Sequence, residues 1–190
     1  KEAVNASLRG LGFSYPAYST KYTPEESKER LLKQIDSLKE EIECIGKIES
    51  IEANFCFDGL ALKNSGTYLF EADQGGALND VGTYLLGFTL TLVKDEVVSI
   101  TSEAKVVDGV DEHFMTHLTF KNGCVAHLEG AIDQNKERYA LIKGQKGCIM
   151  VPMFNRMIDY TITLNDGSSL HRNYPIVGDD MTYQINVLKD

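Results

Sequence analysis

The chain lacks any stretch of about 18 consecutive apolar residues, which a helix needs to cross a bilayer. It also lacks an excess of bases, because 19 lysines and arginines stand against 28 aspartates and glutamates, and the formal net charge is −9. Nucleic acids and anionic membrane surfaces attract basic proteins, so this charge argues against both as partners. The first residues, KEAVNASLRG, contain no apolar core of a signal peptide. We therefore expect a cytoplasmic protein.

Cysteine is scarce, and its spacing excludes the usual cysteine-rich sites. There is no C-x-x-C motif and no cluster of histidines among the 190 residues. Zinc sites and disulfide frameworks use closely spaced cysteines, so we expect buried free thiols at all four positions: Cys44, Cys56, Cys124 and Cys148. The chain is long enough to bury one core of ordinary size. We therefore expect residues 1–190 to form a single domain.

The first element that the sequence predicts is a helix of about six turns ending near Gly46. Thr23 can cap this helix, Pro24 suits its first position, and Glu26 occupies the acid position of a capping box. One apolar stripe follows at helical spacing: Leu31, Ile35, Leu38, Ile42 and Ile45. The preceding loop carries three tyrosines, for which we weigh surface packing against a role in a substrate pocket: Tyr15, Tyr18 and Tyr22.

Short β-type segments follow. The first alternates apolar and polar residues around 48–57, and the others are 97–107, 112–120, 124–132, 138–144, 147–152 and 160–164. Turn signals separate them at Asp108-Gly109, Asn122-Gly123, 145–147 and 165–167. Consecutive hairpins build an antiparallel sheet. The sequence therefore predicts an α+β domain with an open-faced, mainly antiparallel sheet and helices packed on one face.

The Asn122-Gly123 hairpin allows a closer prediction. A two-residue turn would place Leu118 opposite His127, and His117 opposite Leu128. The two histidines would then lie on opposite faces, which would exclude a metal site between them. Both faces would be partly apolar, with Phe114, Leu118, Phe120 and Val125 on one, and Met115, Thr119, Ala126 and Leu128 on the other. An apolar second face predicts a second copy against it, with an irregular covering loop as the alternative.

The stretch GGALNDVGTY contains the candidate site. Asp80 and Tyr84 lie one helical turn apart and share one side of the helix. Gly75 and Gly76 allow a ligand or another backbone to approach the helix start, and Asn79 is a further candidate for substrate binding. Two interpretations are open from spacing alone: a functional pair, or a packing tyrosine and an ordinary first-turn acid.

Four segments in order resemble one known family. They are GG-A-L-x-D-x-G-x-Y, then the stretch from Gly109 to Glu112 (GVDE), then LTFKNGCVAHLEG and IKGQKGCIMVP. Together they resemble the C-terminal domain of the Gfo/Idh/MocA oxidoreductases, the relatives of glucose-fructose oxidoreductase, inositol dehydrogenase and dihydrodiol dehydrogenase. The match runs from about residue 46 to about residue 151.

The resemblance implies a two-domain enzyme. An N-terminal Rossmann domain binds NAD or NADP, and the C-terminal sheet carries the substrate site and the homodimer contact. The reaction moves a hydride between the nicotinamide and a sugar, a polyol or a related alcohol or carbonyl. Asp80 and Tyr84 occupy the positions of the family's D-x-x-x-H/Y motif. Tyr84 would take the substrate proton, helped by a lysine in the nucleotide domain, since a phenol with a pKa of about 10 is a poor base at neutral pH. Asp80 would orient the substrate.

The sequence departs from the family pattern at the cofactor site. It has no G-x-G-x-x-G after a strand and no E-K-P, and both of its ends look cut. We therefore expect a substrate-binding and dimerisation domain of a longer protein, with the NAD(P)-binding Rossmann domain absent from this chain and no activity of its own. The alternatives are a non-catalytic ligand sensor and a purely structural association module. The four histidines are expected to be structural or exposed: His113, His117, His127 and His171.

Overall fold

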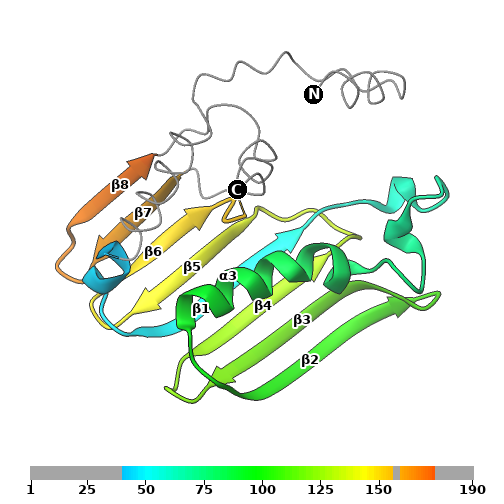
Figure 1. Cartoon of the computed structure of the whole chain (residues 1–190). Coiled ribbons are helices and arrows are strands. Elements are labelled where there is room, and N and C mark those ends of the chain that lie inside the picture. Colours follow the sequence, from blue (N-terminus) through cyan, green and yellow to red (C-terminus); the bar gives the residue numbers. More distant parts are fainter. Residues whose placement is uncertain (1–39, 156–158, 174–190) are drawn as a thin grey trace, which may run out of the picture. The chain divides into compact units, whose positions relative to one another are not determined.

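One eight-stranded sheet dominates the computed structural model, which describes residues 40–155 and 159–173 (Figure 1). The strand order is β2-β3-β4-β1-β5-β6-β7-β8. The strands are β1 (Ile48–Cys56), β2 (Val97–Val107), β3 (Val110–Phe120), β4 (Val125–Ala131), β5 (Tyr139–Gly144), β6 (Gly147–Pro152), β7 (Asp159–Leu164) and β8 (Ser169–Asn173). Neighbouring strands are antiparallel except for β1 and β4, which run parallel. The predicted α+β class with an open, mainly antiparallel sheet is confirmed.

Helix α3 (Thr83–Val93) lies across one face of the sheet, over β1 and β4 (Figure 1). A π-helical turn, η3 (Leu78–Gly82), leads directly into it. Two 3-10 turns precede this turn, η1 (Leu60–Leu62) and η2 (Tyr68–Phe70). The core forms between α3 and the sheet, because every second strand residue faces the helix. Its centre joins Val81 and Leu85 of the helical segment to Ile51 and Ala53 of β1.

Of the helix predicted to end at Gly46, the structure describes residues 40–44, which are helical. Gly46 has a positive φ of 73°, in keeping with a glycine that ends a helix. The predicted cap at Thr23 and the tyrosine-rich loop before it lie outside the described residues.

Two features of the sheet were not predicted. Strand β8 is short and exposed except at the partly buried Arg172, and its sequence, SLHRN, shows no apolar alternation. The parallel pairing of β1 with β4 joins segments far apart in the chain, with Ser50 opposite Val125. Such a pairing leaves no turn signal, because parallel strands require a long connection.

The predicted register of the β3–β4 hairpin is wrong by one residue. The loop contains three residues, since the Phe120 N–H donates to the Cys124 carbonyl at 2.9 Å and the Gly123 N–H donates to the Phe120 carbonyl at 2.9 Å. Gly123 has a φ of +87°, the left-handed conformation that closes a three-residue loop after a type I turn. His117 therefore lies opposite His127, and the prediction that they occupy opposite faces is wrong.

The corrected register sorts the hairpin side chains differently. Apolar residues gather on the helix-facing side: Phe114, Leu118, Phe120, Ala126 and Leu128. The other side, which we call the open face, carries Met115, His117, Thr119, Val125 and His127. The predicted grouping was wrong for Val125, Ala126 and Leu128. The open face of this hairpin is thus mixed in character and less apolar than predicted.

The four cysteines are free thiols, as predicted, but not all are buried. Cys56 and Cys124 are buried, Cys148 is half-buried and Cys44 is exposed, which corrects the expectation for the last two. Burial, reinforced by the charge of Glu129, raises the pKa of the Cys56 thiol to about 11. Cys56 is therefore an unreactive core thiol at neutral pH.

Candidate functional site

The two glycines at the helix start lie against other parts of the chain. A Cβ on Gly75 would lie 2.3 Å from the Leu69 carbonyl oxygen, and one on Gly76 would lie 1.9 Å from Oδ1 of Asp111. Gly76 also has a φ of +98° and donates its N–H to the Leu69 carbonyl at 2.9 Å. The close approach predicted here is therefore made by the protein's own backbone and a carboxylate. Substrate contact at Gly75 and Gly76 stays a prediction.

Asp111 caps the helical segment that carries the candidate pair. Its Oδ2 accepts a hydrogen bond from the Leu78 N–H at 2.7 Å, and a carboxylate is favoured at a helix N-terminus. The position where a helix start would otherwise bind an anion is therefore occupied. Asn79, a predicted substrate ligand, is exposed and donates its side-chain amide to the Gly75 carbonyl at 2.9 Å.

Asp80 meets a phenol that the sequence analysis did not identify. The Tyr68 hydroxyl donates to Oδ1 of Asp80 at 2.5 Å. This hydrogen bond raises the pKa of Tyr68, and the charge of Asp80, partial burial and nearby Tyr84 act in the same direction. Tyr68 is 54% exposed and Tyr84 is 51% exposed, so a ligand can reach both phenols. We call Asp80, Tyr84 and Tyr68 the polar triad.

Aromatic packing holds Tyr84 in place. Its ring lies 5.6 Å from the ring of Phe55, with an interplanar angle of 50°. Phe55 in turn packs against Phe154, and the Arg138 guanidinium carbon lies 3.3 Å from the Phe55 ring centroid. The Tyr84 hydroxyl is thus the polar end of a ring whose body is fixed at the end of β1. A carboxylate and two phenols beside such a surface suit a ligand that carries several hydroxyl groups.

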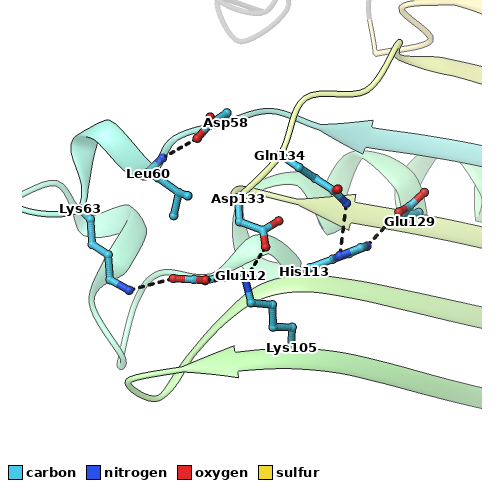
Figure 2. A network of polar contacts seen from close by, with 9 residues as sticks. All are labelled: Asp58, Leu60, Lys63, Lys105, Glu112, His113, Glu129, Asp133 and Gln134. Carbon is cyan, nitrogen blue, oxygen red and sulfur yellow. Dashed lines mark hydrogen bonds and ion pairs between the residues drawn. The ribbon is translucent and has the colours of Figure 1, made fainter.

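A network of charged side chains around the buried Glu112 (Figure 2) anchors the loop that carries Tyr68. The buried Glu112 accepts from Nζ of Lys63 at 2.9 Å and lies 3.3 Å from Nζ of Lys105. Lys105 also lies 2.7 Å from Oδ2 of Asp133. These carboxylates raise the pKa of both lysines, chiefly through Glu112 at Lys63 and through Asp133 at Lys105. Both lysines therefore stay protonated at neutral pH.

The two adjacent acids of the GVDE motif, Asp111 and Glu112, bind the two ends of the segment 63–78. Glu112 binds Lys63, and Asp111 binds the backbone of Leu78. Tyr68 lies between these two anchors. Tyr68 and Asp80 are not separated by a helical or strand repeat, which explains why the sequence analysis did not identify Tyr68 as part of the site. The geometry indicates that the GVDE motif positions the polar triad.

Replacing Asp80 with asparagine is expected to lower the pKa of Tyr68, because the charged carboxylate that accepts the hydrogen bond of the phenol disappears. NMR titration of tyrosine labelled at the hydroxyl-bearing carbon measures this pKa. Since the raised pKa favours the protonated phenol, the contact stabilises the fold below the unfolded pKa of about 10 and is lost as pH rises through the folded value. Asp73→Asn, an exposed acid of the same loop, is the matched control. An unchanged Tyr68 pKa in Asp80→Asn would contradict the contact.

Within residues 40–155 and 159–173, no group of three or more histidine, cysteine, aspartate or glutamate side chains is placed to hold a metal ion. In the same ranges, no helix is long and apolar enough to cross a membrane.

Comparisons with known proteins agree with this architecture. The family model described as GFO/IDH/MocA C-terminal domain matches residues 38–150. No curated protein matches the sequence. Among solved structures, an inositol dehydrogenase homolog from Azotobacter vinelandii, complexed with NADH and myo-inositol, superposes with a TM-score of 0.62 at 11% identity, over 76% of this chain and 39% of its own.

Two further structures are similar. Levoglucosan dehydrogenase in complex with NADH and levoglucosan gives a TM-score of 0.61 at 20% identity, over 83% of this chain and 50% of its own. A UDP-N-acetylglucosamine 3-dehydrogenase from Acidithiobacillus ferrooxidans gives a TM-score of 0.56 at 17% identity, over 80% of this chain and 46% of its own. At these identities the likeness establishes the fold. The chain spans at most half the length of these three proteins.

Proposed function

Because the chain belongs to the family of GFO/IDH/MocA C-terminal domains, we propose that it is the substrate-binding and dimerisation domain of an NAD(P)-dependent oxidoreductase. The proposed substrate is a sugar, a polyol or a related alcohol or carbonyl. The similar dehydrogenase structures hold NADH together with myo-inositol or levoglucosan, which supports this class.

The polar triad, with two exposed phenols and a half-buried carboxylate, is the observation that carries the proposal. Oxidation of an alcohol breaks a C–H and an O–H bond; the hydride passes to NAD(P)⁺ and the proton to a base. Tyr84 is the proposed proton acceptor, since the residue is 51% exposed and its ring is fixed against Phe55. Asp80 uses one oxygen to hold Tyr68 and has a second oxygen for a substrate hydroxyl. Gly75, Gly76 and Asn79 complete the proposed substrate-binding set.

The described residues do not fit a dinucleotide site. A pyrophosphate usually binds at the N-terminus of a helix. The longest helical segment of the described residues already has the carboxylate of Asp111 at its start, and this negative charge would repel the pyrophosphate. In the proposal, NAD or NADP is therefore bound by a domain outside this chain. The isolated 190-residue chain is expected to bind no dinucleotide and to be inactive.

The test uses the intact protein that carries this domain. A panel of cyclic polyols, hexoses and anhydrosugars is supplied with NAD⁺ or NADP⁺, and formation of reduced nicotinamide is followed by absorbance. Turnover of at least one of these compounds supports the proposal. An intact protein that binds neither cofactor would overturn it and favour the ligand sensor.

The open face is the proposed contact with a second copy of the chain. Exposed apolar side chains lie on it, including Met115 and Met150. We expect a dimer by light scattering at tens of micromolar, and Met115→Lys should shift it to a monomer by placing a charge in the contact. Leu90→Lys is the matched control, because Leu90 of α3 is 45% exposed and Met115 is 44% exposed. A monomeric wild-type chain would contradict the dimer.

Cytoplasmic location is part of the proposal. All four cysteines are free in the structure, which suits a reducing compartment.

A further inference from the structure

Strand β2 forms one edge of the sheet, and all of its residues 98–106 are exposed. Helix α3 packs over β1 and β4, away from this edge (Figure 1). Three apolar side chains of β2 are more exposed than the other large apolar side chains that the structure describes, at 57% for Val98, 64% for Ile100 and 61% for Val106. An edge strand presents a row of backbone N–H and C=O groups, and apolar side chains beside such a row favour pairing with another strand.

The sequence of β2, VVSITSEAKVV, has nearly the same apolar pattern in both directions, with Ser102 at its centre. If two copies of β2 run antiparallel with their Ser102 residues opposite each other, apolar residues meet apolar residues: Val97 with Val107, Val98 with Val106, and Ile100 with Ala104. Polar residues meet polar residues in the same alignment: Ser99 with Lys105, and Thr101 with Glu103. A two-fold axis through Ser102 produces this alignment, and two-fold symmetry is the commonest among homo-oligomers. We propose that β2 pairs edge to edge with β2 of a second copy, antiparallel and centred on Ser102.

The backbone geometry of β2 has the same centre as its sequence pattern. The pairing with β3 is regular from Ser99 to Lys105, and a register shift lies on each side of this stretch, between Val97 and Ser99 and between Lys105 and Val106. Such irregularities bend a strand and interrupt its edge. The part of β2 that is regular enough to accept another strand is therefore centred on Ser102.

The pairing would also extend an existing apolar row. Ile100 and Ala104 lie opposite Leu118 and Phe114 of β3, on the helix-facing side of the sheet. In the proposed alignment, Ile100 of each copy meets Ala104 of the other. The apolar row of β3 would thus continue through β2 into the second copy, and cross-strand pairs of this kind stabilise a sheet.

This contact lies at an edge of the sheet, so it leaves the open face available for the contact proposed above. One strand from each copy buries little surface, and small interfaces are weak. We therefore expect the open face to associate first, and β2 to join two such dimers above about 100 μM. The inference rests neither on the dehydrogenase function nor on the open face, because β2 would pair two single chains in the same way.

Sedimentation equilibrium of the full chain, from about 10 μM to about 1 mM, tests the contact. At the upper concentrations, wild type should pass from dimer to tetramer and Met115→Lys from monomer to dimer. Ile100→Lys should abolish this step, because it places a charge in both apolar pairs next to the axis. Leu170→Lys is the matched control, since Leu170 is 42% exposed on β8, the other edge strand, and a reversed β8 would place it opposite Arg172. A step that Leu170→Lys abolishes and Ile100→Lys preserves would overturn the proposal, as would the absence of any step.

Cysteine cross-linking tests the register of the pair. In a Cys44→Ser background, which removes the exposed native thiol, Ser102→Cys should form a disulfide-linked dimer in oxidised glutathione. Directly opposite residues have Cα atoms about 4.5–5.5 Å apart, and a disulfide needs about 4.4–6.8 Å. Ser99→Cys is the matched control, because its two copies would lie about 20 Å apart along the paired strands.

We expect Ser102→Cys to cross-link at least about tenfold faster than Ser99→Cys, since pairing raises the effective concentration of its thiols. Both serines are exposed, so both variants should melt at the wild-type temperature. Equal rates at the two positions would show that the strands do not pair in this register. No cross-link in Ser102→Cys at about 1 mM would also contradict the pairing.

Discussion

If the proposed function holds, replacing Tyr84 with phenylalanine in the intact protein that carries this domain is expected to lower kcat about 10²- to 10⁴-fold, the usual contribution of a positioned general base. The change removes only the hydroxyl. The phenylalanine ring keeps the contact with Phe55, so the melting temperature should stay at the wild-type value. Because the lost interaction acts mainly in the transition state, KM should change much less than kcat. Steady-state kinetics and a thermal melt measure both effects.

Tyr68→Phe is the matched control for this prediction. It removes a phenol of similar exposure from the same triad, and it frees Asp80 from its hydrogen bond. A positioning role at Tyr68 should act mainly through substrate binding, so KM should rise more than kcat falls. Full turnover in Tyr84→Phe would eliminate the proton-transfer role. A larger loss of kcat in Tyr68→Phe than in Tyr84→Phe would assign that role to the other phenol.

Local patterns were sufficient to predict seven of the eight strands that the structure describes, all but β8. Glycine-containing turns marked β3 at both ends, at Asp108-Gly109 and Asn122-Gly123, and its buried residues alternate. These signals depend on neighbouring residues alone. The Asp108-Gly109 turn has two residues with positive φ, as its sequence suggests. The Asn122-Gly123 pair closes a three-residue loop instead, although the dipeptide is similar. The dipeptide alone does not determine loop length, and one residue of difference reverses the faces of the following strand.

The candidate site was predictable only in part, for a related reason. Asp80 and Tyr84 share a helix, so their spacing in the sequence fixes their separation in space. Tyr68 reaches Asp80 because Glu112 and Asp111 hold the segment between Lys63 and Leu78. These contacts join a loop to a strand 49 and 33 residues further along the chain, and no local periodicity encodes them. The side chains that shape the site are therefore harder to predict than the helix that carries it.

Gly75→Ala should destabilise the domain by about 1–3 kcal/mol, the range for forcing an extra carbon into a packed site. The new Cβ would lie 2.3 Å from the Leu69 carbonyl oxygen and 2.5 Å from the Tyr68 carbonyl oxygen. Both atoms belong to the backbone, so rotation of a side chain cannot relieve the contact. Urea unfolding measures the change in free energy.

Gly87→Ala is the matched control, since nothing lies within 4 Å of a Cβ at this exposed position of α3. Alanine there should stabilise the helix by up to about 1 kcal/mol, because glycine loses more backbone entropy on folding.

The two variants also separate the roles considered for Gly75. A close-packing role predicts that Gly75→Ala displaces η2, moves Tyr68 away from Asp80 and lowers the pKa of Tyr68 even without substrate. If instead stability and the Tyr68 pKa stay at wild-type values while substrate binding weakens, the glycine serves the ligand and the packing argument is wrong.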